Sequence, residues 1–165
     1  MLKNRVLLLL VCVFFSLSSC DSKYYFDVYK SVPKKWHKDS VVSFKIDPPD
    51  SINPYNLFIN LRNTSAYKYN NLFLIVEMVF PHGKTVKDTL EYKMAEPSGK
   101  FLGTGFGDIK ENKLWYKEQV VFNESGKYKV NIQQAMRENG KVNGVEELEG
   151  ITDVGFSIEQ KKIKK

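Results

Sequence analysis

The sequence has few of the residues that most often carry chemistry or covalent cross-links. Its 165 residues include two cysteines, Cys12 and Cys20, and two histidines, His37 and His82. No Cys-x-x-Cys or His-x-x-x-His pair occurs, so the spacing typical of a zinc site is missing. There is no Gly-x-Ser-x-Gly elbow, and no Gly-Lys-Ser/Thr follows the glycine-rich stretch 103–107. We therefore expect a protein that is not an enzyme, with no metal, no cofactor and no small-molecule substrate.

Long apolar runs are also scarce, and the one at the N-terminus has a recognisable setting. Residues 6–15 are too few to cross a bilayer, which takes about 20 apolar residues as a helix. Basic Lys3 and Arg5 precede the run, and Leu17-Ser18-Ser19-Cys20 follows it. This pattern is typical of a secretory signal and resembles a bacterial lipoprotein box. It predicts a signal peptide at 1–19 and lipidation of Cys20, the alternative being an ordinary signal with a chance cysteine.

Removal of residues 1–19 would leave a domain with no disulfide and no remaining free thiol once Cys20 is acylated. The formal charge would fall from +6 to +4, because Lys3 and Arg5 leave with the signal. The basic residues are scattered apart from a tail at 161–165, so nothing resembles a nucleic-acid-binding patch. We expect a tether at 20–23, one domain at 24–160 and a basic tail at 161–165, with a size usual for a single domain.

Apolar segments separated by turn residues predict about eight short strands and almost no helix. They lie at 24–30, 42–46, 55–62, 72–80, 85–94, 114–122, 127–132 and 151–159. This spacing favours an all-β fold, a single antiparallel β-sandwich of immunoglobulin-like type. The nearly continuous apolar run at 72–80 should be a central strand, and 135–150 should be a loop or a short helix. Tyr128, after Gly126, is either a tyrosine corner or simply an inward-facing aromatic residue.

The stretch from Gly99 to Trp115 is the longest irregular segment expected in the domain. Phe101, Phe106, Trp115 and Tyr116 cluster in and beside it, and aromatic side chains often anchor protein interfaces or stack on sugars. We expect an exposed connection that carries partner contacts. The alternatives are that the loop packs on its own domain and that most of these aromatic residues belong to the core.

Several of these features, taken together and in order, resemble the gliding motility lipoprotein GldH family of Bacteroidota. They are Cys20, the strand 71–76, the hairpin 81–92, Gly103-Thr104-Gly105, Gly126-Lys127-Tyr128 and the segment 150–156. The resemblance implies a cell-envelope lipoprotein required for gliding and offers no catalytic residues to carry over. It implies contacts with envelope motility and secretion proteins, and a membrane partner through Cys20. We expect the protein to be anchored at the outer membrane, facing the periplasm. The competing hypothesis for its function is a carbohydrate-binding or adhesin-like module.

Overall fold

The computed structural model describes residues 24–160, so the expected signal, Cys20 and the basic tail lie outside the described residues. Ten strands and no helix make up the described part of the chain. Their bounds are β1 Tyr24–Ser31, β2 Lys35–His37, β3 Val42–Ile46, β4 Tyr55–Asn63, β5 Asn71–Val79, β6 Thr85–Lys93, β7 Lys110–Val120, β8 Tyr128–Gln134, β9 Glu147–Glu149 and β10 Ile151–Gln160.

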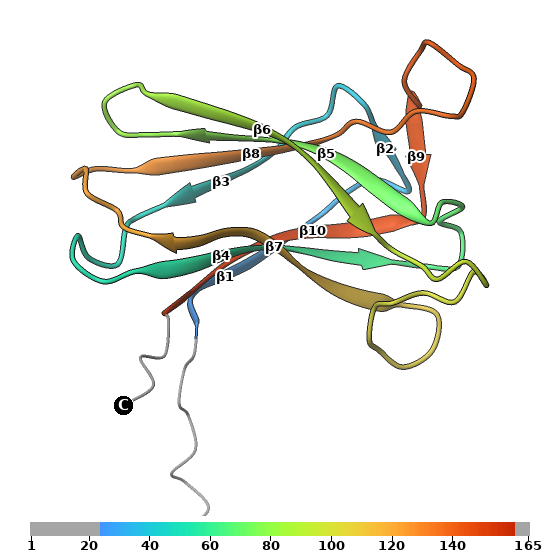
Figure 1. The fold of residues 1–165 in the computed structure, drawn as a ribbon, viewed down its shortest axis with the longest axis horizontal. Helices are drawn as coiled ribbons and strands as arrows, with labels where there is room; N and C mark the ends of the chain where they lie inside the picture. The colour runs from blue at the N-terminus through green and yellow to red at the C-terminus, as the bar shows by residue number, and fades with distance from the viewer. Residues whose placement is uncertain (1–23, 161–165) are drawn as a thin grey trace, which may run out of the picture.

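Two four-stranded antiparallel sheets face each other, and a short ribbon lies at one end of them (Figure 1). Sheet I has the order β1-β10-β4-β7 and sheet II the order β3-β8-β5-β6, while β2 and β9 form the ribbon. The expected all-β antiparallel sandwich is confirmed. The strand order is that of a double-sheet jelly roll and differs from the order of the immunoglobulin fold, so the expected immunoglobulin-like type is corrected here.

Alternating side chains of both sheets fill the space between them, as period-two patterning requires. In β5 the buried positions alternate with half-buried ones, which places Leu74 and Val76 in the core and Ile75 on the outer face. Strand β5 lies between β6 and β8, so its central position in a sheet was predicted correctly. The partial exposure of the outer face of β5 was not predicted, because the apolar run indicated a strand that is buried on both faces.

Other boundaries differ from the sequence-based prediction in ways that have local causes. Strand β7 begins at Lys110, where β4 supplies a pairing partner at Asn63, so the irregular stretch is shorter than expected. Residues 135–150 contain no helix and include β9, which pairs with β2. Both ribbon strands have three residues, too few for an alternating pattern to be visible in the sequence.

Tyr128 satisfies both interpretations that its sequence context left open. Its ring is buried and packs edge-on against Phe122, with centroids 5.0 Å apart. Its hydroxyl accepts a hydrogen bond from the Glu124 amide at 3.0 Å and lies 3.3 Å from the Glu124 carbonyl oxygen. A bond back to the backbone a few residues upstream is the device of the tyrosine corner, here inside a jelly roll.

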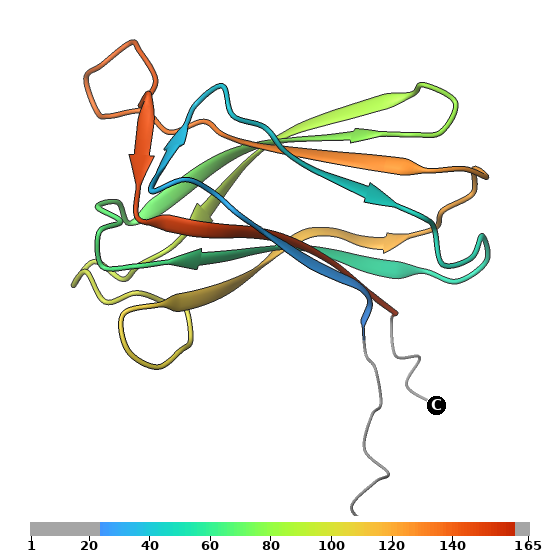
Figure 2. The same cartoon turned by 180° about the vertical axis from the view of Figure 1, so that it is seen from behind.

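The antiparallel pairing gives the sandwich two distinct ends (Figures 1 and 2). The terminal end holds the start of β1, the end of β10 and the connections 47–54, 80–84 and 121–127. The distal end holds the β2–β9 ribbon and the connections 64–70, 94–109 and 135–146.

Candidate functional site

The segment expected to be one long loop consists of two parts with different packing. In the first part, which lies within residues 94–102, the Leu102 amide donates to the Met94 carbonyl at 2.9 Å, and Ala95 forms an isolated β-bridge with Phe101. The Phe101 side chain is half-buried and packs against the core. This part therefore folds back on its own domain, as the self-packing alternative had it.

The second part, which we call the Phe106 loop (residues 104–111), projects from the distal end. Its base is closed by reciprocal backbone hydrogen bonds between Thr104 and Glu111, at 2.9 and 2.7 Å. The Lys110 ammonium donates to the carbonyl oxygens of Gly105 and Gly107, both at 3.0 Å. At its tip Phe106 is fully exposed. An ordered loop thus presents a large aromatic ring to solvent.

Two further features fix the shape of the Phe106 loop. Gly105 has φ +144°, and a Cβ there would lie 2.5 Å from the Ile109 carbonyl oxygen, so a side chain has no room. The Asp108 carboxylate accepts a hydrogen bond from the Ser65 amide at 2.9 Å, which ties the loop to the β4–β5 connection. Hydrogen bonds from Ser65 also hold the pKa of Asp108 below its usual range.

Trp115 lies in β7, on the outer face of sheet I, and not in the loop. Its side chain is 52% exposed, and its ring centroid lies 4.4 Å from that of Phe58. The Lys113 ammonium lies over the Phe58 ring, 4.1 Å from its centroid, and also forms an ion pair with Glu159. Phe58 is buried in consequence, although no element of the described chain covers this face.

A second contact on the outer face of sheet I likewise combines an aromatic ring, a cation over that ring and an ion pair. Arg62 pairs with Glu111 at 3.0 Å and lies over the Tyr29 ring at 4.2 Å. A Cβ on Gly155 would lie 2.8 Å from the Tyr29 ring, so the glycine lets that ring lie flat on the sheet. Burial and the nearby Glu111 carboxylate raise the pKa of Tyr29. Sequence reasoning missed this layer, because its members come from strands far apart in the chain.

Tyr116 follows Trp115 in β7 and faces the other way. It is buried between the sheets, where its hydroxyl donates to the Asp88 carboxylate at 3.1 Å and burial raises its pKa. The four predicted binding residues thus occupy three environments. Phe106 is exposed on the loop, Trp115 is half-exposed on sheet I, and Phe101 and Tyr116 pack inward.

A groove of about 490 Å³ on the outer face of sheet II is a second candidate region. Its floor includes Phe73 and Ile75 of β5, and its walls include Lys38, Met136 and Arg137. The apolar floor explains why β5 reads as a continuous apolar run. The Ala135 amide donates to the Phe73 carbonyl at 2.9 Å, so the segment after β8 closes one side of the groove.

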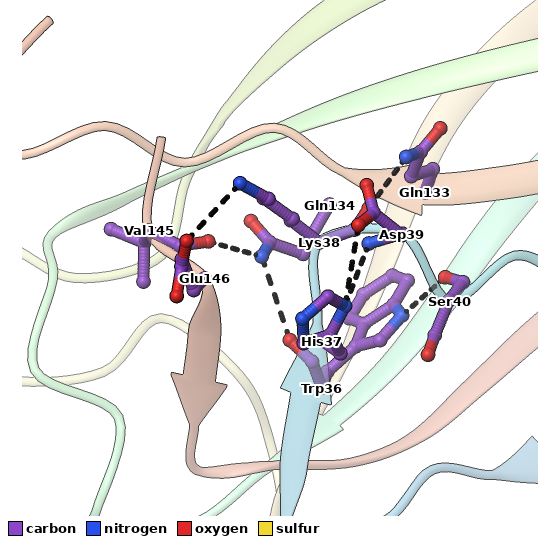
Figure 3. Close-up of polar contacts among 9 residues, drawn as sticks. All are labelled: Trp36, His37, Lys38, Asp39, Ser40, Gln133, Gln134, Val145 and Glu146. Carbon is purple, nitrogen blue, oxygen red and sulfur yellow. Dashed lines mark hydrogen bonds and ion pairs between the residues drawn. The ribbon is translucent and has the colours of Figure 1, made fainter. Parts of the chain in front are cut away.

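Side-chain hydrogen bonds around the ribbon hold the groove wall in place (Figure 3). Gln134 donates to the Val145 carbonyl at 2.8 Å and accepts from the Met136 amide at 2.9 Å. The buried Trp36 indole donates to the Ser40 carbonyl at 2.9 Å. Lys38 pairs with Glu146 across the ribbon at 3.4 Å. These polar groups satisfy one another, which is the pattern of a structural support.

The described residues contain no cluster of His, Cys, Asp and Glu that could hold a metal ion. His37 contacts Asp39 at 3.8 Å, and His82 pairs with Glu124 at 3.1 Å at the opposite end of the molecule. Within residues 24–160 no helix is long and apolar enough to cross a membrane. The arrangement offers surfaces for contact: an aromatic tip, an aromatic and ionic sheet face and an apolar groove.

An all-β sandwich domain behind the expected lipoprotein signal is the architecture of a lipid-anchored protein of the cell envelope. The model of the GldH lipoprotein family matches residues 24–158, and the chain belongs to this family. The chain is therefore a gliding-motility lipoprotein of the cell envelope.

Two relatives share most of their length with this chain. The gliding motility lipoprotein GldH homolog of Christiangramia forsetii is 63% identical over 143 residues, which are 87% of this chain and 88% of that protein. The gliding motility lipoprotein GldH of Flavobacterium johnsoniae is 59% identical over 160 residues, 97% of this chain and 98% of that protein. A solved structure of infectious bursal disease virus Gt strain is 13% identical with a TM-score of 0.37, over 82% of this chain and 31% of that one.

Proposed function

We propose that this protein acts without catalysis, as an envelope lipoprotein that is anchored through Cys20 and binds a protein of the motility or secretion machinery through the Phe106 loop. The observation that carries the proposal is the full exposure of Phe106 at the tip of a loop fixed by Lys110. Large aromatic residues that bury on binding supply much of the energy of protein interfaces. A loop that is already ordered loses little conformational freedom when it binds.

The position of the loop supports the same proposal. The lipidated residue precedes β1, so the anchor leaves from the terminal end, while the Phe106 loop lies at the distal end. A strand of the length of β10 spans about 33 Å at about 3.3 Å per residue. The loop is therefore held away from the anchored end, where it can meet a partner. We place the protein at the outer membrane with its domain in the periplasm.

The test compares Phe106→Ala with Val142→Ala, a control at the same end whose side chain is 88% exposed. Both variants should melt like the wild type, because neither side chain is buried. Phe106→Ala should lose colony spreading and crosslinks from the loop in intact cells, and Val142→Ala should keep both. Unchanged spreading and crosslinking in a normally expressed Phe106→Ala protein would contradict the proposal.

Trp115 supports a second candidate function, a carbohydrate-binding module. Its half-exposed ring beside the ionic residues of sheet I is a surface on which a sugar could stack. Soluble glycans or cell-wall material that bind the wild type and not Trp115→Ala would favour this function. Glycan binding that survives Trp115→Ala would rule out this face.

A further inference from the structure

The terminal end carries a second ordered loop that exposes an apolar side chain. Ile52, in the connection between β3 and β4, is 82% exposed. Asp50 holds its backbone: the carboxylate accepts hydrogen bonds from the Ile52 amide at 2.8 Å and the Asn53 amide at 2.7 Å. The Tyr55 hydroxyl and the Asn53 side chain donate to the same carboxylate. The loop, residues 50–55, is here called the Ile52 loop.

Other exposed apolar residues lie at the same end of the sandwich as the Ile52 loop. Tyr25 and Val121 are exposed, and the Tyr25 ring lies 6.4 Å from that of Tyr55. Tyr55 in turn packs against Phe122, with ring centroids 6.1 Å apart. The exposed tyrosine and aliphatic side chains therefore share one end of the sandwich with a buried aromatic support beneath them. A tyrosine with an apolar body and a polar hydroxyl suits a membrane–water interface.

The length of chain ahead of β1 limits how far this end can lie from the lipid. Three residues, 21–23, separate Cys20 from Tyr24. Four successive Cα–Cα steps of 3.8 Å span at most about 15 Å. The chain leaves β10 at the same end, since Tyr24 pairs with Glu159, and four lysines follow in residues 161–165. Basic residues near a membrane favour anionic lipid.

We infer that the terminal end of the domain rests on the lipid bilayer, with Ile52, Tyr25 and Val121 in the headgroup region. This inference rests on the proposed lipid anchor at Cys20. The bilayer contact orients the sandwich so that its distal end, with the Phe106 loop, points away from the membrane. One lipid-linked segment alone would leave the domain free to tumble, whereas a second contact fixes its direction.

The experiment uses the full lipidated chain in vesicles of phosphatidylethanolamine and phosphatidylglycerol. Ile52→Cys and the matched control Val142→Cys are labelled with a polarity-sensitive thiol dye, since both side chains are exposed aliphatics at opposite ends. An acylated Cys20 leaves the introduced thiol as the only one in the mature chain. Brominated acyl chains should quench the dye at position 52 and leave the dye at position 142 unchanged. Val121→Cys, a second reporter at the terminal end, should be quenched as well.

Three results would decide against the inference or its premise, and a fourth would support it. Equal quenching at positions 52 and 142, or none at either in vesicle-bound protein, overturns the bilayer contact. Quenching at position 52 that disappears in Ile52→Cys protein carrying Tyr25→Asp would support it, because the neighbouring contact would be lost. Dye uptake by the wild type together with release from vesicles would show that Cys20 is not acylated, which removes the anchor itself.

Discussion

The Ile52 loop and the Phe106 loop are each held in shape by one charged side chain, and the two side chains have opposite charges. At the terminal end a carboxylate, Asp50, accepts hydrogen bonds from amides and a hydroxyl. At the distal end an ammonium, Lys110, donates to two carbonyl oxygens. Each loop contains a large apolar side chain that is almost fully exposed, Ile52 in one and Phe106 in the other.

The difference between the tips indicates different partners. Phe106 is an aromatic ring on a narrow projecting loop, which suits insertion into a pocket on another protein. Ile52 has exposed tyrosine and aliphatic neighbours across a broader end, which suits contact with a surface. The sandwich thus joins two ends for which we propose different contacts, the bilayer at the terminal end and a protein partner at the distal end.

The largest expected effect comes from weakening the sandwich that joins both ends. Leu74→Ala should lower the free energy of unfolding by about 2–5 kcal/mol, because Leu74 is fully buried and the cavity would remain. Ile75→Ala is the matched control on the outer face of the same strand and should cost about half as much or less. Chemical denaturation of the two variants measures the difference. Equal losses would mean that the groove floor is packed as tightly as the core.

Glycine substitutions should affect the two ends unequally. Gly83 at the terminal end and Gly150 at the distal end have nearly equal φ values, +89° and +87°. Alanine at either position incurs the left-handed backbone cost of about 1–2 kcal/mol. At Gly150 a Cβ would also lie 2.1 Å from the Tyr67 amide nitrogen, whereas at Gly83 nothing lies within 4 Å. Gly150→Ala should therefore melt well below Gly83→Ala, and similar melting temperatures would contradict the close backbone approach.

The features of this fold that could be predicted are those that depend on a short stretch of sequence. Alternation within one strand, as in residues 55–61, is visible in the sequence and correctly predicted the strands of an antiparallel sandwich. The ribbon was missed because Trp36 and Leu148 pair across a long sequence separation in strands of three residues. The jelly-roll order likewise depends on which strands pair, which no local pattern records.

The candidate site shows the same limit. The composition of residues 99–115 pointed to Phe106, and the structure places that side chain at an exposed tip. Composition alone could not separate Phe106 from Phe101, because the fold-back of residues 95–102 depends on the bridge to Ala95. The ionic layer around Phe58 and Tyr29 needs four strands in register, so it becomes visible only in the folded sheet.

The smallest expected effect separates the two loops by acid titration. Hydrogen bonds, first from the Asn53 backbone and then from Tyr55, hold the pKa of Asp50 well below its usual value near about 3.9. Hydrogen bonds from Ser65 lower the pKa of Asp108 in the Phe106 loop, with fewer donors. A carboxyl whose folded pKa is lowered stabilises the fold above its unfolded pKa and loses that contribution as the pH falls through the folded pKa.

Both carboxyls are therefore fully charged at neutral pH, and both contacts weaken only below about pH 4. Asp108 should become protonated first, so the Ser65 amide signal should shift before the Ile52 and Asn53 amide signals in an NMR titration from neutral to acidic pH. The hydrogen bonds from Lys110 to the Gly105 and Gly107 carbonyl oxygens involve no carboxyl group, so this part of the Phe106 loop should hold after Ser65 is released. Asp50→Asn removes the carboxylate at every pH, so the Ile52 and Asn53 amide signals should already be displaced from their wild-type positions at neutral pH. The titration of the Ser65 amide signal should remain unchanged. If the Ile52 amide moved before that of Ser65, the four hydrogen bonds around Asp50 would not be the stronger support, and the proposed difference between the two ends would be reversed.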